Sequence, residues 1–238
     1  METTCSLSVN KAKLSWWQSS RAVLAKDLLA ELRSRSALST LLLFVVTTVS
    51  VVSFSTARVR LSAEVQAALL WVIVFFAAMT GLSRSFVHEE ESGTADTLRL
   101  AALSEAVFLG KFCFNFLLLA MVEVITVPLS LALWGISVRA PLLLVAVLFT
   151  GNIGVSAVAT LVAAIVAQTT MQSGLFTALS FPVLLPLLLS AVRATFFTLN
   201  LPLDTSAFGH ALRALALYGI VMITVGLMLF DYIWREGR

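Results

Sequence analysis

Six stretches of this chain are apolar and about as long as a lipid bilayer is thick. A helix needs about 20 mostly apolar residues to cross the hydrocarbon core. Of the 238 residues, 59% are hydrophobic and only 12% are charged, whereas about a quarter of the residues in a soluble domain are charged. The sequence therefore predicts an all-α integral membrane protein with spans at 37–54, 65–82, 112–136, 140–166, 175–192 and 214–230.

The segment before the first span predicts an amphipathic helix over residues 16–35. Its apolar side chains share one side of a helical wheel, whereas Lys26 and Arg33 face away from that side. Two tryptophans at its start are typical of a helix that lies in the membrane interface. A helix in solvent that leads into the first span is the alternative. The apolar side holds Trp17, Leu24, Leu28, Leu29 and Leu32.

The basic residues predict the orientation, because cytoplasmic segments of membrane proteins carry an excess of Lys and Arg. With a cytoplasmic N-terminus, eleven of the 16 Lys and Arg residues fall on the inner side and five on the outer side. We expect a cytoplasmic segment at 1–36, a transmembrane domain at 37–230 and a cytoplasmic tail at 231–238. The basic residues lie between apolar runs rather than beside aromatic residues on one face. Membrane lipid is therefore an expected partner, and nucleic acid is not.

The polar segment 83–111 separates the second and third spans. Gly93 permits a sharp turn, and Ser92 or Thr94 can cap a short helix after it. Leucine and alanine then recur at helical spacing, which suits docking into the groove of a partner. A surface helix that packs on the ends of the spans is the alternative. The candidate docking residues are Glu89, Glu90, Glu91, Gly93, Thr94, Asp96, Leu98, Arg99, Ala101 and Ala102.

Two further residues are candidates for a function. Glu123 is an acid near the middle of the third predicted span, where an ionised side chain costs several kcal/mol, so it is a functional candidate by default. A structural hydrogen bond to a neighbouring helix is the alternative. His210, at the outer end of the last span, is a weak candidate for a haem or metal ligand. A polar residue at a helix end is the simpler interpretation.

Three local patterns predict irregular structure. Pro182 and Pro186 remove backbone donors and predict a break in the fifth span. The uncharged sequence at 168–174 predicts a tight turn between two helices. Residues 193–213 predict either a short interfacial or re-entrant helix or a connecting loop with aromatic anchors.

The familiar enzymatic motifs do not occur in the sequence. Gly110 and Lys111 do not form a phosphate-binding loop, because Glu105 stands where that motif needs glycine and no Ser or Thr follows the lysine. Neither G-x-S-x-G nor H-E-x-x-H occurs. We expect no enzymatic activity in this chain, no metal site and no cofactor bound directly. ATP would act through a partner subunit.

The segment around 89–111 resembles the CcmB family, the permease subunits of the cytochrome c maturation system. The family commonly has a proline near Ala102, which this chain lacks. The resemblance implies an ABC-2-type permease, with the 83–111 segment coupled to a separate ATPase. The matching residues are Glu89, Glu91, Gly93, Leu98, Leu100, Phe108, Leu109, Gly110 and Lys111.

The same resemblance implies partners and a cellular role. The partners would be the ATPase CcmA, the subunits CcmC and CcmD, and the haem chaperone CcmE, in a hetero-oligomer with or without a second copy of this chain. The role would be ATP-dependent release of haem-loaded CcmE at the bacterial inner membrane, with haem as the cargo of the complex. An exporter of a lipid, drug or polysaccharide, and an assembly scaffold without movement, are the alternatives.

Overall fold

A computed structural model describes residues 16–59, 61–82, 103–167, 172–200 and 204–236. These residues form helices and no strand, which confirms the predicted all-α class. Six of the helices are long and apolar enough to cross a membrane, and a further helix precedes them. The helices are α1 (Trp16–Ser34), α2 (Ser36–Thr56), α3 (Ala63–Leu82), α6 (Ser104–Trp134), α7 (Pro141–Ala167), α8 (Gln172–Leu199) and α9 (Thr205–Glu236).

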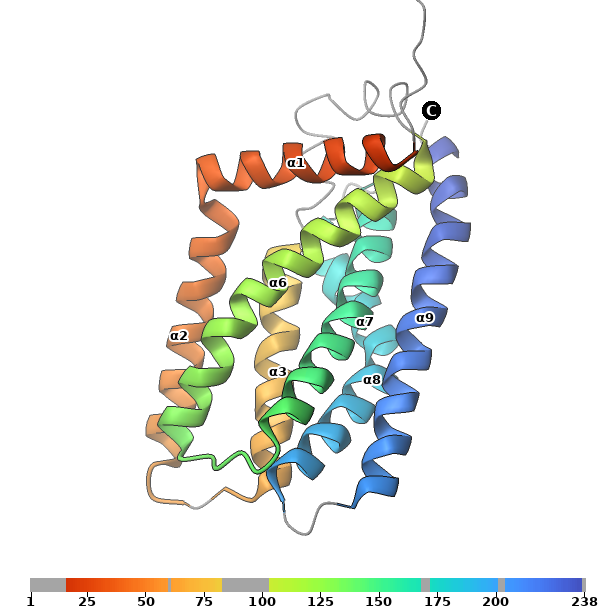
Figure 1. Cartoon of the computed structure of the whole chain (residues 1–238). Coiled ribbons are helices and arrows are strands. Elements are labelled where there is room, and N and C mark those ends of the chain that lie inside the picture. Colours follow the sequence, from red (N-terminus) through yellow and green to blue (C-terminus); the bar gives the residue numbers. More distant parts are fainter. Residues whose placement is uncertain (1–15, 60, 83–102, 168–171, 201–203, 237–238) are drawn as a thin grey trace, which may run out of the picture.

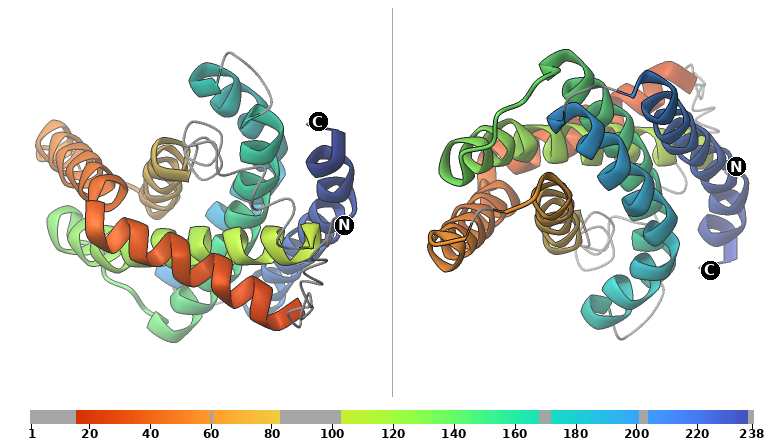
Figure 2. Two further views of the ribbon diagram at one scale, coloured as in Figure 1. Left: turned by 90° about the horizontal axis from the view of Figure 1, so that it is seen from above. Right: turned by 90° about the horizontal axis from the view of Figure 1, so that it is seen from below.

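The long helices form a bundle, and α1 lies across one end of it, where α6 begins and α9 ends (Figure 1). We call this the α1 end. α7 occupies the centre, packed against α6, α8 and α9. α2 and α9 lie at opposite edges when the bundle is viewed along its length (Figure 2). Large apolar side chains such as Phe54, Leu142 and Met228 point out of the bundle with at least 70% of their surface exposed, as expected of side chains that contact lipid.

The chain turns sharply between α1 and α2 at Arg35, which has a left-handed backbone with φ of 53°. The carboxylate of Glu31 accepts a hydrogen bond of 2.8 Å from the backbone N–H of Leu38. This bond satisfies one of the N–H groups that the start of a helix leaves without a helical partner. The turn therefore sets α1 across the bundle rather than in line with α2 (Figure 1).

α1 turns a face of small and polar side chains toward the bundle. Ser19, Ser20, Val23 and Asp27 are buried there, at helical spacing. The apolar residues behind the prediction of an amphipathic helix lie elsewhere, and the most exposed of them is Trp17, with 67% of its surface accessible. The predicted helix is confirmed, and its exposed apolar residues are free to contact lipid.

Glycines bring α7 close to its neighbours. A Cβ on Gly151 would lie 2.2 Å from the ring of Trp71 on α3. That indole is fully buried and donates a hydrogen bond of 2.8 Å to the hydroxyl of Thr195 on α8. Gly154 lies against Gly219 of α9, where a Cβ on either residue would contact the other backbone. Small residues at helix contacts are typical of membrane bundles.

The predicted break at Pro182 and Pro186 is wrong, because α8 is one continuous helix that contains both prolines. Neighbouring helices can satisfy backbone groups that a proline leaves without a partner. The carbonyl of Val183, in the turn before Pro186, accepts a hydrogen bond from the hydroxyl of Tyr218 on α9. This hydrogen bond ties α9 to α8 between the two prolines.

Two other boundaries differ from the predictions. Residues 193–199 belong to α8 and 205–213 to α9, so neither a separate helix nor a long loop occupies 193–213. Residues 104–111, predicted as the end of the polar segment, form the first turns of α6. The predicted turn at 168–174 lies largely outside the described residues, and α8 already begins at Gln172.

Candidate functional site

The first two turns of α6, residues 104–111, are held by α1 on one side. We call this segment the α6 entry. The ammonium group of Lys111 lies 3.0 Å from the Asp27 carboxylate of α1, and Lys111 is only 2% exposed. Beside this pair, a Cβ on Gly110 would lie 2.7 Å from the Cβ of Val23. The glycine thus allows the two helices to approach closely enough for the ion pair to form.

α9 holds the α6 entry from the other side. The hydroxyl of Ser104 donates a hydrogen bond of 2.6 Å to the carboxylate of Asp231. Four residues later, the ring of Phe108 is fully buried and packs on Phe230, with ring centroids 5.5 Å apart. Gly226 makes room for it, because a Cβ there would lie 2.4 Å from the Phe108 ring. The α6 entry is therefore fixed by polar and apolar contacts to two helices.

The ion pair is costly to break. Lys111 is the eighth residue of α6, about 10 Å along the helix from Ser104. Removal of one partner from a buried pair leaves the other charge without compensation and typically costs about 3–5 kcal/mol. α1 and the α6 entry are thus joined by a contact that resists separation.

Farther along α6, a seam of polar side chains joins α6 to α7. The amide nitrogen of Asn152 lies 3.3 Å from a carboxylate oxygen of Glu123. The hydroxyl of Ser156 donates to the side-chain oxygen of Asn152 at 2.9 Å. One turn farther along α7, the hydroxyl of Thr160 accepts a bond of 2.9 Å from the amide of Asn115. All five side chains are buried.

The seam shows how Glu123 is accommodated in a spanning helix. Its side chain is 6% exposed and faces α7 rather than the outside of the bundle. The second carboxylate oxygen is buried and makes no hydrogen bond to any described residue. The predicted interhelical hydrogen bond of Glu123 is therefore present, and a functional role remains a prediction.

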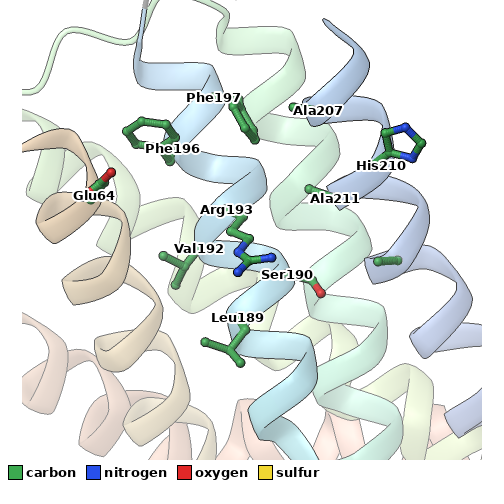
Figure 3. A pocket seen from close by; sticks show the side chains of 11 residues that line it. Glu64, Leu189, Ser190, Val192, Arg193, Phe196, Phe197, Ala207, His210 and Ala211 are labelled. Carbon is green, nitrogen blue, oxygen red and sulfur yellow. The ribbon is translucent and has the colours of Figure 1, made fainter. Parts of the chain in front are cut away.

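A cavity of about 790 Å³ lies at the opposite end of the bundle from α1, between α3, α8 and α9 (Figure 3). Arg193 lies within it, and Phe196 and Phe197 lie on the next turn of α8. Ala207, His210 and Ala211 line it from α9. His210 thus lies at this cavity, and its role as a haem or metal ligand remains a prediction.

The candidate docking residues, Glu89, Glu90, Glu91, Gly93, Thr94, Asp96, Leu98, Arg99, Ala101 and Ala102, lie outside the described residues. Their role stays a prediction. The structure adds Asp27, Asn152 and Asn115, which the sequence alone did not single out. In the structure, Asp27 continues the buried series Ser19, Ser20 and Val23 on one face of α1.

These features define the class, a multi-pass α-helical membrane protein with six spanning helices behind an N-terminal helix. The family model described as "CcmB protein" matches residues 18–230, and the chain belongs to the CcmB family. No curated protein matches the chain in sequence. CcmB proteins are permease subunits of an ABC-type haem exporter of cytochrome c maturation. The chain is thus a permease subunit rather than an enzyme, and it belongs to a complex with an ATPase partner.

Proposed function

We propose that this permease transmits ATP-driven movement of its ATPase partner, CcmA, from the 83–102 segment into the membrane through the α6 entry. The purpose of the movement is release of haem-loaded CcmE from the complex with CcmC and CcmD, with haem as cargo. The protein acts in the bacterial inner membrane with both termini in the cytoplasm. ATP binds the partner, and no residue of this chain is required to bind a cofactor.

The buried Asp27–Lys111 pair carries the proposal. The 83–102 segment follows α3, which ends at Leu82, and precedes the α6 entry, which begins at Ser104. A displacement of that segment acts directly on the first turns of α6. Because Lys111 is tied to α1 and Ser104 to α9, a push on the entry would move three helices together rather than bend one helix alone.

The experiment compares Lys111→Ala with the exchanged pair Asp27→Lys and Lys111→Asp in the complete complex. Three quantities are measured: assembly with the ATPase subunit, ATP hydrolysis, and the amount of mature cytochrome c in cells. We expect Lys111→Ala to assemble and hydrolyse ATP but to yield about tenfold less mature cytochrome. The exchanged pair should recover part of the lost cytochrome maturation, because it restores opposite charges at positions 27 and 111.

If Lys111→Ala and wild type assemble equally and yield equal amounts of mature cytochrome c, the Asp27–Lys111 ion pair does not transmit movement. Two separate variants test the docking segment: charge reversal at Glu89, Glu90 and Glu91, and the helix-breaking Leu98→Pro. Both changes should uncouple ATP hydrolysis from maturation without preventing membrane insertion. A scaffold without movement predicts instead that the uncoupling variants mature cytochrome normally once assembled.

A further inference from the structure

The cavity at the end opposite α1 combines apolar walls with two charged side chains, Arg193 and Glu64. Its walls are mostly apolar, with Leu189, Val192 and Phe196 on α8 facing Ala211 and Ala214 on α9. α9 leaves the space open because it contributes alanines where larger side chains would fill it. The cavity opens toward the outside of the bundle, since Leu189 is 57% exposed.

Arg193 is an exposed cation that borders these apolar side chains. It lies six residues before the end of α8 at Leu199, about 9 Å from that end. Among the described residues it forms no ion pair. An arginine at this depth reaches toward the headgroup level of a bilayer, where the available anion is a lipid phosphate.

A second charge borders the cavity on its other side. Glu64, in the first turn of α3, is exposed and lies across the cavity from α9 (Figure 3). It too forms no ion pair with a described residue. A cation and an anion on two neighbouring helices match a headgroup that itself carries a phosphate and an ammonium group.

The geometry points to a binding site for one glycerophospholipid with an amine-bearing headgroup, of the phosphatidylethanolamine class. The guanidinium of Arg193 binds the phosphate, and the carboxylate of Glu64 receives the ammonium group. One acyl chain lies along Leu189 and Val192, opposite the alanines of α9. The lipid belongs to the leaflet at the end opposite α1, and it fills a gap between α8 and α9 that side chains leave open.

The experiment is native mass spectrometry of the purified complex after removal of loosely bound lipid. Phosphatidylethanolamine, phosphatidylglycerol or phosphatidylcholine is then added back. Wild type is compared with Arg193→Gln and with the control Arg213→Gln, an exposed arginine of α9 outside the cavity. We expect one bound phosphatidylethanolamine with affinity reduced about tenfold by Arg193→Gln, the effect of losing one charge-assisted hydrogen bond. Arg213→Gln should bind like wild type.

Two further variants keep the test decisive. Ala211→Phe fills the cavity without touching either charge, and it should displace the lipid even if Arg193→Gln assembles poorly. Glu64→Gln should abolish the preference for phosphatidylethanolamine over phosphatidylglycerol. Equal lipid retention by wild type, Arg193→Gln and Ala211→Phe would overturn the proposal. Cross-linking of Ala211→Cys to another subunit in the native membrane would overturn it as well, because a protein would then occupy the cavity.

Discussion

The side chains of Lys111 and Asp27 form a buried ion pair with 3.0 Å between nitrogen and oxygen, although α1 and α6 are separated by two spanning helices in the chain. Both side chains of the pair are buried, with Lys111 2% and Asp27 8% exposed. Asp27 also lies 3.5 Å from Lys26, whose side chain is 47% exposed and therefore partly solvated. Lys111 is the buried partner of the two lysines, so its ammonium group compensates the charge of the Asp27 carboxylate.

Lys111→Met should destabilise the protein by about 3–5 kcal/mol, because it leaves the Asp27 carboxylate buried beside an apolar chain. Asp27→Leu combined with Lys111→Met should recover most of this loss, since the double variant buries no charge. Unfolding of the detergent-solubilised protein, followed by circular dichroism, measures the difference. The matched control is Lys26→Met, which removes the exposed neighbour and should change the free energy of unfolding by less than about 1 kcal/mol.

A double variant as unstable as Lys111→Met alone would contradict this account. It would mean that the two side chains act separately rather than as a pair.

Because Asn152 joins α7 to α6, we expect its side chain to contribute more to the stability of the fold than its neighbours on α7. Asn152→Leu removes the donor to Glu123 and the acceptor of the Ser156 hydroxyl, leaving buried polar groups without partners at a cost of about 1–3 kcal/mol. The control is Thr150→Val, which loses a hydrogen bond of 2.7 Å to the carbonyl of Ala146 in its own helix. Thermal unfolding should show a clear loss of stability for Asn152→Leu and a small loss for Thr150→Val. Equal losses would argue against a role for the seam in joining the helices.

The spans could be predicted from sequence because lipid exposure and length act on each helix separately. The contacts that join the helices could not be predicted from the sequence. Nothing local in the sequence pairs Lys111 with Asp27, and nothing near Glu123 names Asn152 as its donor. The prolines of α8 led to the wrong prediction of a break, and the hydroxyl of Tyr218, which bonds to α8 between them, comes from a different helix, α9.

We expect the stability of the fold to depend on pH through Asp204, at the start of α9. Its carboxylate accepts hydrogen bonds from the backbone N–H of Ala207, at 3.0 Å, and from the hydroxyl of Ser206, at 2.8 Å. These bonds, in that order, hold the pKa of the carboxyl below its usual value of 3.8. A lowered pKa in the folded state means that the carboxylate stabilises the fold above pH 3.8 and that this contribution is lost as the pH falls through the native pKa.

The control for this pH dependence is Asp204→Asn, which can still cap the helix but does not titrate. The thermal midpoint of wild type minus that of the variant should be positive at about pH 5 and should shrink toward about pH 3. A difference that does not change with pH would show that the carboxylate charge contributes nothing to the cap.

Gly151 and Gly209 form a matched pair for the packing of the bundle. A Cβ on Gly151 would lie 2.2 Å from the ring of Trp71, which is held by its hydrogen bond to Thr195. A Cβ on Gly209 would meet nothing within 4 Å. Gly151→Ala should therefore destabilise the protein by about 1–3 kcal/mol, as overpacked cores do, whereas Gly209→Ala should stabilise α9 by up to about 1 kcal/mol. Chemical unfolding of both variants in one detergent measures the contrast, and a tolerated Gly151→Ala would mean that α3 can move away from α7 at little cost.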